Sequence, residues 1–351
     1  MRQIPWKKLI ETFIIGAAGG AAFYALNFPL PWLLGSLLFV MLWQTLTKRP
    51  MYSPSPLKNT GFLIMGGFFG LYFSLETLLR TTSYLLPYLF LSLFLIVISI
   101  GMSILFAKWI TIDSKTSILS TLPGGLNTMV ISSDSIGAKT SLVTIFQTIR
   151  RLAVLFIVPF LIVHFFTDSD ADTDDREMPA PDFDGEGSYF WYAIPVAAAI
   201  MVRKKGPLKF LAFPLLCIFL MNAGGVPFPP LHQSLLIAAQ VMVGTSLGKN
   251  TNLDHLKAGG KYGIFYFTAS LILIAVSFGL GYILTLFTDL SLSTALISMS
   301  PGGIVEMILL AEDIDADPPA VITLQLTRII FIILLVVPIL KWYFNRRAPF
   351  S

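Results

Sequence analysis

Charged side chains, cysteine and histidine are all scarce in this chain of 351 residues. Only 13% of the residues are charged and 55% are hydrophobic, and the mean hydropathy is +0.76. A soluble domain of this size carries more charge, so the composition indicates a multi-pass membrane protein. The single cysteine, Cys217, excludes an internal disulfide and a cysteine-built metal site. Because the three histidines are dispersed along the chain, we expect no metal and no cofactor.

A concentrated basic region is also missing, although the formal net charge is +4. The lysines and arginines lie in small groups at the ends of apolar stretches. No basic helix or recognisable DNA-binding motif stands apart from those stretches. We therefore expect the lipid bilayer to be a partner and nucleic acid not to be one.

One motif does occur twice: Leu-Pro-Gly-Gly at residues 122–125 and Ser-Pro-Gly-Gly at residues 300–303. Proline removes a backbone donor and glycine tolerates positive φ, so each copy is expected to end a helix. In hydrocarbon, such a break persists only where protein or a watery cavity satisfies the freed backbone groups. Two breaks at matching places in two half-chains indicate a substrate site between repeats.

The two motifs belong to a duplication of the whole chain with an offset of 178 residues. The matched residues include Gly66 with Gly244, Gly70 with Gly248, Ser92 with Ser270, Thr116 with Thr294, Gln147 with Gln325 and Arg150 with Arg328. Such self-similarity predicts two membrane repeats, residues 1–167 and 188–351. Between them lies an acidic linker, residues 168–187, which we expect to be extracytoplasmic.

Each half contains five apolar stretches that could cross a bilayer core of about 30 Å as helices. They cover residues 9–27, 30–47, 60–76, 84–108 and 140–166, then 189–202, 208–223, 232–248, 262–287 and 319–344. The expected fold class is all-α: a polytopic membrane protein with about five transmembrane helices per repeat. The Pro-Gly-Gly segment either re-enters as a hairpin or breaks a crossing helix, and we favour the re-entrant hairpin.

Paired small residues in the third stretch of each half predict close helix packing. The spacing Gly-x-x-x-Gly occurs at Gly66 and Gly70 and again at Gly244 and Gly248. Small residues at this spacing let two helix backbones approach each other. We interpret these glycines as packing residues and give them no further role.

Basic loops occupy non-equivalent places in the two halves. Arg203, Lys204 and Lys205 follow the first stretch of the second half, whereas their counterparts at residues 25–27 carry no charge. Since cytoplasmic loops carry the excess of lysine and arginine, the halves are expected to be inserted in opposite orientations. This predicts inverted repeats in the plasma (inner) membrane, with the N- and C-termini cytoplasmic.

The expected solute site combines both breaks with the helices that follow them. Glycines allow close approach to backbone amides, and the N-terminus of a helix suits an anion. We expect the hairpin tips and the polar residues of the following helices to line one pocket. The predicted solute-binding residues are Gly124, Gly125, Asn127, Thr128, Gln147, Arg150, Gly302, Gly303, Glu306, Gln325 and Arg328.

Two of these residues, Arg150 and Arg328, lie about nine residues inside apolar helices, roughly 13 Å at 1.5 Å per residue. An arginine at that depth is costly and faces a cavity or a partner. The guanidinium groups bind an anionic solute, hold carbonyls freed at the breaks, or do both. Arg151 has Ile329 at its matching position and is expected to be less central. Glu306 is the best candidate for a proton or cation site, unless it forms a salt bridge to Arg328.

Three motifs together resemble the AbrB-type duplicated membrane protein family. They are the paired Pro-Gly-Gly segments, Pro-Trp-Leu-Leu-Gly at residues 31–35 and Ser-Pro-Gly-Gly-Ile-Val-Glu-Met at residues 300–307. The resemblance covers nearly the whole chain and implies a multi-pass duplicated membrane protein. The names used in the family imply a regulator of gene expression, an ammonia monooxygenase or a transporter-like protein. An oxygenase needs clusters of histidine and carboxylate, which are missing here, so we expect no enzyme.

We expect a secondary transporter that moves a small anionic or carboxylated solute by alternating access between inverted repeats. The alternative is a membrane sensor or regulatory protein that binds a ligand without moving it. The expected partners are the small-molecule solute and the bilayer. The sequence leaves open whether H+ or Na+ is the coupling ion and whether the chain forms a homo-oligomer.

Asp175→Cys and Arg346→Cys test the expected topology. Because the linker is expected outside and the C-terminus inside, an impermeant thiol reagent added to intact cells labels only position 175. Labelling of both positions, or of position 346 alone, contradicts the arrangement. A variant without Cys217 and without either new cysteine sets the background signal.

Overall fold

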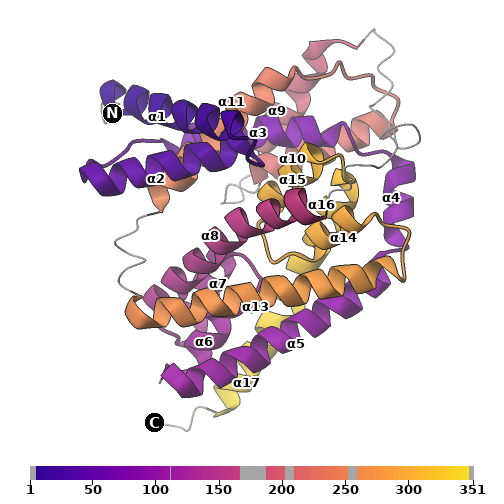
Figure 1. The fold of residues 1–351 in the computed structure, drawn as a ribbon. Helices are drawn as coiled ribbons and strands as arrows, with labels where there is room; N and C mark the ends of the chain where they lie inside the picture. Colours follow the sequence, from indigo (N-terminus) through magenta and orange to yellow (C-terminus); the bar gives the residue numbers. More distant parts are fainter. Residues whose placement is uncertain (1–4, 111, 167–186, 202–208, 252–258, 348–351) are drawn as a thin grey trace. The chain divides into compact units, whose positions relative to one another are not determined.

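The computed structural model describes residues 5–110, 112–166, 187–201, 209–251 and 259–347, and every element in these ranges is a helix (Figure 1). The all-α class is therefore confirmed, and the described residues of each predicted stretch are mainly helical, although the stretch 60–76 is divided between two helices that end at Gly70 and begin at Leu75. The acidic linker up to residue 186 lies outside the described residues, as do Arg203, Lys204 and Lys205. Their positions therefore stay predictions.

Four helical segments of the described chain are long and apolar enough to cross a membrane. They are α5 (Leu85–Ile110), α8 (Thr140–Phe165), the part Tyr262–Thr285 of α13 (Gly260–Thr285) and the segment Pro318–Phe344. A fifth is added if α3 (Ser55–Gly70) and α4 (Leu75–Thr82), which meet at a bend of 88°, count as one span. The helices are therefore compatible with a multi-pass membrane protein.

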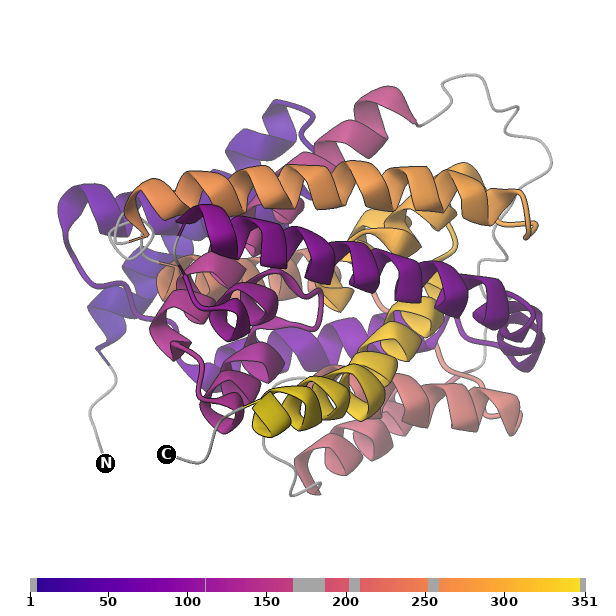
Figure 2. The same cartoon turned by 90° about the horizontal axis from the view of Figure 1, so that it is seen from below.

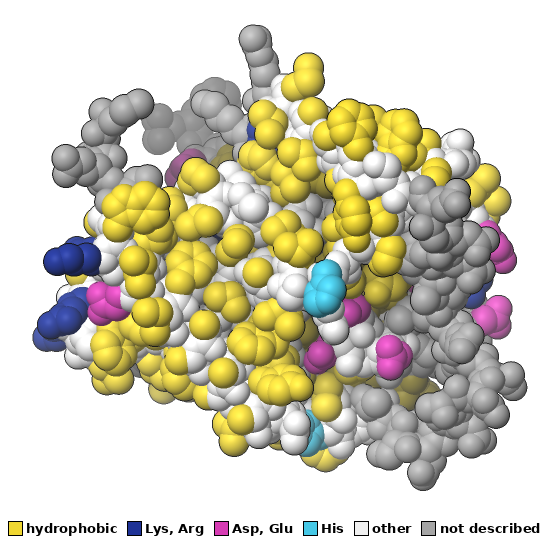
Figure 3. Space-filling model, turned by 90° about the horizontal axis from the view of Figure 1, so that it is seen from above, with side chains coloured by type: hydrophobic (Ala, Val, Ile, Leu, Met, Phe, Trp, Pro, Cys, Tyr) yellow, Lys and Arg dark blue, Asp and Glu magenta, His cyan; other side chains and the backbone are white. Residues whose placement is uncertain are grey.

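Helix α5 shows how such a segment presents apolar side chains to its surroundings. Leu86, Phe90 and Val97 recur at helical spacing and are 80%, 72% and 57% exposed. Hydrophobic side chains also cover much of the face of the molecule in Figure 3. Exposed apolar surface on this scale is unfavourable in water and is the normal surface of a protein in hydrocarbon.

Contacts divide the chain into two compact units that do not coincide with its two halves. Unit 1 contains residues 1–79 and 169–252, and unit 2 contains residues 80–168 and 253–351. With the offset of 178, the two pieces of each unit cover nearly equivalent parts of the duplication. Each unit is therefore built from matching parts of both halves.

Unit 1 holds the first three stretches of each half. Its helices are α1 (Trp6–Ala25), the π-helical turn η1 (Pro31–Gly35), α2 (Ser36–Thr47), α3, the 3-10 turn η2 (Tyr189–Tyr192), α9 (Ala193–Met201), α10 (Lys209–Ala223) and α11 (Gln233–Asn250). Helix α3 packs against α10 and α11, and α11 also packs against α2. The third stretch of each half thus contacts the second stretch of the other.

Glycines make these contacts close, as the sequence predicts. A Cβ atom at Gly66 would lie 2.3 Å from the carbonyl oxygen of Leu211, and one at Gly244 would lie 2.5 Å from that of Leu33. Leu33 and Leu211 are themselves matched by the offset. The two halves therefore exchange the same contact, which is what a two-fold relation within unit 1 produces.

Unit 2 holds both Pro-Gly-Gly segments. Two of its long helices, residues 85–110 (purple) and 260–285 (orange), lie side by side in Figure 2. From the first half this unit contains α5, α6 (Ser114–Thr121), α7 (Leu126–Ile136) and α8. From the second half it contains α13 (Gly260–Thr285), α14 (Leu292–Met299), α15 (Ile304–Asp313), α16 (Pro318–Phe331), the π-helical turn η3 (Ile332–Val336) and α17 (Val337–Arg347).

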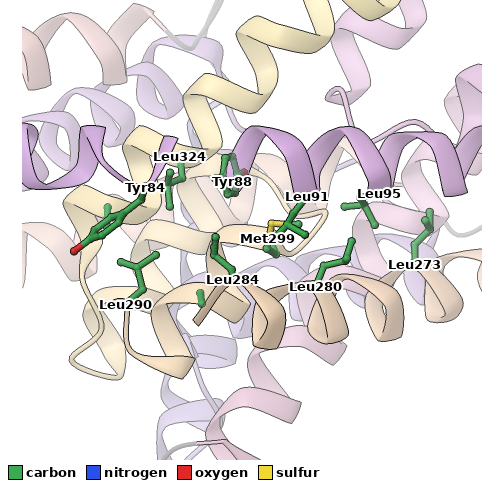
Figure 4. Close-up of a cluster of buried hydrophobic side chains, with 12 residues drawn as sticks. Tyr84, Tyr88, Leu91, Leu95, Leu273, Leu280, Leu284, Leu290, Met299 and Leu324 are labelled. Atoms are coloured by element: carbon green, nitrogen blue, oxygen red, sulfur yellow. The ribbon is translucent and has the colours of Figure 1, made fainter. Parts of the chain in front are cut away.

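The matched helices α5 and α13 pack side by side and run in opposite directions. Their buried side chains belong to one hydrophobic cluster (Figure 4). Tyr84 lies at the same end of this cluster as Leu290, and Leu95 lies at the other end with Leu273. Residue numbers therefore increase along α5 in the direction in which they decrease along α13, so the two helices are antiparallel.

Gly248→Ala tests the close packing in unit 1. The new methyl group would lie 2.4 Å from the carbonyl oxygen of Leu37, and overpacking of this kind costs about 1–3 kcal/mol. We expect a lower thermal unfolding temperature for the purified protein. Gly279→Ala is the matched control, because no atom lies within 4 Å of its new methyl group, and it should leave the temperature unchanged or raise it. Equal effects of the two changes contradict the packing role.

Candidate functional site

Each Pro-Gly-Gly break joins two short helices into a hairpin. The backbone N–H of Lys139 donates to Thr116 Oγ1 at 2.9 Å, and that of Asp317 donates to Thr294 Oγ1 at 3.0 Å. Since Thr116 lies at the start of α6 and Lys139 follows α7, the segment returns to the place where it began. The second half repeats this arrangement, and both segments are therefore helical hairpins; their entry from one side of the membrane stays a prediction.

Glycine serves different purposes at the two hairpin tips. Gly125 is exposed and has φ of +82°, a conformation that glycine adopts readily and other residues rarely do. Gly303 has φ of −83°, and its advantage is space. A Cβ atom there would lie 2.1 Å from Glu306 Oε2, because that side chain folds back over the break. Gly124 and Gly302 lie against Met129 and Met307, which occupy matching positions.

The carbonyl groups freed at the first break are bound by α8. Arg150 Nη1 donates to the carbonyl oxygen of Thr121 at 2.9 Å, and Arg150 Nη2 donates to Gln147 Oε1 at 2.8 Å. Gln147 Nε2 in turn donates to the carbonyl oxygens of Leu119 at 2.6 Å and Leu122 at 3.2 Å. Arginine and glutamine act together here because they lie one helical turn apart on one face.

The second break has the same arrangement at the matched positions. Arg328 Nη1 donates to the carbonyl oxygens of Met299 at 3.2 Å and Ser300 at 2.9 Å. Gln325 Nε2 donates to the carbonyl oxygen of Ile297 at 3.0 Å, and Gln325 Oε1 accepts from Arg328 Nη2 at 3.3 Å. Of the two roles left open for the arginines, the structure shows that they hold carbonyls at the breaks.

Both of these guanidinium groups are buried without a neutralising carboxylate. Arg150 is 6% exposed and Arg328 is 1% exposed, and neither forms a salt bridge within the described ranges. The Nε atom of each is buried and has no hydrogen-bond partner there. A Cβ atom at Gly124 would lie 3.0 Å from Ile332, which is one helical turn after Arg328, so the first break lies beside the helical segment that carries the second arginine. The carbonyl oxygens that the two arginines bind lie at the C-terminal ends of α6 and α14, where each helix dipole has its negative end.

Glu306 forms its ion pair with Arg151 and not with Arg328, which corrects the expected partner. The distance from Arg151 Nη2 to Glu306 Oε1 is 2.6 Å. From the sequence, we expect Arg151 to be less central than Arg150 and Arg328, and we expect Arg328 to be the partner of Glu306 if a salt bridge forms. Arg328 instead holds backbone carbonyls, because it points to the end of α14 rather than to the start of α15.

This ion pair leaves a signal in the repeat alignment. The counterpart of Glu306 is Thr128, and that of Arg151 is Ile329. Several polar residues near the breaks have the same residue type at the matched position, but these two charged residues do not. Two charged residues that are both unmatched in this way are candidates to contact each other. Thr128 itself is half-buried in α7, and its side chain makes no hydrogen bond within the described ranges. Asn127 also lies in α7, but its side chain is outside the described part of the structure.

Two tyrosines that sequence reasoning overlooked also bind the hairpins. The hydroxyl of Tyr88 on α5 donates to the carbonyl oxygen of Ser298 at 3.1 Å. The hydroxyl of Tyr266 on α13 donates to Ser117 Oγ at 3.0 Å. Tyr88 and Tyr266 are matched by the offset, so each half supports the hairpin of the other. Their shared position in the duplication is the signal that could have identified them.

Acidic residues lie at the opposite ends of the hairpins from the tips. Asp134 on α7 accepts a hydrogen bond from Thr140 Oγ1 at 2.5 Å. Its counterpart Glu312 lies in the last turn of α15, where burial and the neighbouring Asp313 and Asp315 raise its pKa to about 7. Within the described ranges, no three histidine, cysteine, aspartate or glutamate side chains are grouped to hold a metal ion.

Comparison with known proteins identifies one family model and two relatives with similar sequences. Residues 4–344 match the sequence model of a family described as "Transition state regulatory protein AbrB". "Uncharacterized protein YhjN" of Bacillus subtilis (strain 168) is 29% identical over 252 residues, 64% of this chain and 62% of that protein. "Putative regulator AbrB" of Escherichia coli (strain K12) is 28% identical over 152 residues, 43% of each chain. The chain spans less than two thirds of the length of either relative.

Glu312→Gln tests the environment of the second hairpin's open end. A pKa raised from 4.5 to about 7 means that the folded state prefers the neutral acid. The contribution of Glu312 to stability is therefore fully present below pH 4.5 and is lost as the pH rises through 7. We expect the unfolding temperature of the wild type to fall relative to that of Glu312→Gln across this window. Parallel pH profiles for the two proteins contradict the raised pKa.

Proposed function

This chain belongs to the AbrB family, and we propose that it moves a small anionic or carboxylated solute across the membrane by alternating access between inverted repeats. The observation that carries this proposal is the pair of matched, buried arginines at the two hairpins. They place two positive charges in one region without a carboxylate partner among the described residues. A region of this kind attracts an anion more strongly than bulk water does, because a buried charge is weakly screened.

Inverted insertion of the halves is supported by the antiparallel packing of α5 and α13. A two-fold axis that exchanges antiparallel helices is perpendicular to them. If these helices cross the bilayer, the axis lies in the plane of the membrane, which is the relation found in inverted-repeat transporters. We infer about five crossings per half, with the hairpins entering from opposite sides and both termini in the cytoplasm.

Hairpins of this kind suit a solute path. Non-helical backbone is tolerated at membrane depth where it is buried in protein or lines a watery cavity. Both breaks, both buried arginines and the Glu306–Arg151 pair lie in unit 2, so we assign the solute site to this unit. Unit 1, with its glycine-mediated helix contacts, is then the scaffold, and H+ or Na+ is the expected coupling ion.

A second function, regulation, is favoured by the printed names of the matched family and of one relative. The family description contains the term "regulatory protein", and the matched protein of Escherichia coli carries the word "regulator" in its name. In this case the same site binds a ligand and changes the state of the membrane protein without moving the ligand. Nucleic acid is not needed as a direct partner in this proposal.

Arg150→Lys and Arg328→Lys test the transport proposal in sealed proteoliposomes with radiolabelled acetate and succinate. Lysine keeps the charge, but it lacks the planar fork that holds a carbonyl and a glutamine at once. We expect flux to fall at least about tenfold, the equivalent of about 1.4 kcal/mol. Arg80→Lys is the control, because this side chain is 61% exposed and pairs with Asp317 at the surface.

The unfolding temperature of each variant is measured alongside the flux, so that loss of fold is not mistaken for loss of function. Normal flux in both lysine variants shows that transport does not depend on the hydrogen bonds that these arginines make at the breaks. A carboxylate that raises the unfolding temperature of the wild type while no flux occurs in sealed vesicles favours the regulatory function instead.

A further inference from the structure

The Glu306–Arg151 pair is unusual because the duplicated fold does not require it. The matched positions hold Thr128 in the first half and Ile329 in the second, and these two residues cannot form an ion pair. The hairpin of the first half nevertheless has the same arginine–glutamine hydrogen bonds and the same closing hydrogen bond to a threonine. The hairpin fold therefore forms without this ion pair, so we look for a role of the pair other than folding the hairpin.

Arg151 also differs from the other two arginines in what it holds. Arg150 and Arg328 donate to backbone carbonyls at the breaks, and losing those contacts would leave buried polar groups unpaired. Arg151 has one described partner, the carboxylate of Glu306. Its side chain is 37% exposed, whereas that of Glu306 is 4% exposed. Arg151 is thus the guanidinium group that a solute can reach and whose partner can be exchanged.

The carboxylate of Glu306 lies where a small anion is favoured. It belongs to the first turn of α15 and folds back over Gly303, the residue that precedes the helix. Its charge is therefore close to the positive end of α15 and is paired with a guanidinium group. A helix N-terminus combined with an arginine is a common recognition site for carboxylates.

We propose that Arg151 binds the carboxylate of the solute and that Glu306 is an internal carboxylate that occupies this site until the solute displaces it. The proposal rests on the proposed function and names the residue that recognises the solute. The ligand class is a small molecule with at least one free carboxylate. Arg150 and Arg328 then position the hairpins and add to the positive potential, without contacting the solute.

Displacement of Glu306 has a structural consequence. Glu306 is carried by the hairpin of the second half, and Arg151 is carried by α8 of the first half. Their ion pair ties the tip of one hairpin to a helix of the other repeat. A solute carboxylate on Arg151 releases this tie, so binding is coupled to freedom of the hairpin tip.

The test measures acetate binding to the purified full-length protein, from the rise in unfolding temperature as acetate is titrated at constant ionic strength. Glu306→Thr copies the residue of the other half and leaves Arg151 without its internal competitor. We expect its apparent affinity for acetate to be at least about tenfold higher than that of the wild type, equivalent to about 1.4 kcal/mol. Chloride at the same ionic strength should show no such gain.

The double variant Glu306→Thr/Arg151→Ile is the matched control. It carries the uncharged residues found at the two matched positions, Thr128 and Ile329, and leaves no unpaired buried charge, so it is expected to fold. It should lose the acetate response that Glu306→Thr gains. If Glu306→Thr does not fold, Glu306→Gln replaces it, since the amide keeps the size of the side chain and removes its charge.

Two results overturn the proposal: no gain in acetate affinity when Glu306 is neutralised, or a gain that persists after Arg151 is replaced. Failure of the proposed function gives a different result. Acetate binding that follows the expected pattern, in a protein that moves no carboxylate across vesicles, refutes transport and leaves the assignment of Arg151 intact.

Discussion

The structure of unit 2 depends on satisfying the carbonyl groups that proline and glycine free at the two breaks. Each break interrupts a helix between short segments that are buried on most sides. Arg150 with Gln147, and Arg328 with Gln325, reach those carbonyls from the next helix along the chain. Without such donors, a broken helix in an apolar setting leaves costly unpaired groups. The deep arginines are thus first a requirement of the hairpins, and their charge is what remains available for function.

Duplication supplies the second organising constraint. In unit 1, Gly66 contacts Leu211 and Gly244 contacts Leu33, so the matched helices exchange the same close approach. In unit 2, Tyr88 and Tyr266 each bind the hairpin of the other half. These exchanged contacts hold the two halves together within each unit. A fold assembled this way brings both hairpins into one unit, although they are far apart in sequence.

Function in such a fold is expected where the symmetry is broken. The shared residues build and close the hairpins in both halves, and so they report on architecture. Glu306 and Arg151 are charged, in contact and unmatched. The regulatory term in the family's description and the transport proposal can both be accommodated by one carboxylate site. They differ in whether displacement of Glu306 leads to passage of the solute or only to a change of state.

The sequence by itself determined the all-α class, the duplication, the ends of the long helices and the positions of both breaks. These follow from composition, from the length of apolar runs and from the local chemistry of proline and glycine. It also limited Arg150 and Arg328 to two roles. The tertiary structure shows the carbonyl contacts of both arginines. It pairs Glu306 with Arg151 rather than Arg328, and it directs the hydroxyl groups of Tyr88 and Tyr266 to the hairpins of the opposite halves. Such partners are far apart along the chain, and only helix packing sets which side chains come within hydrogen-bonding distance.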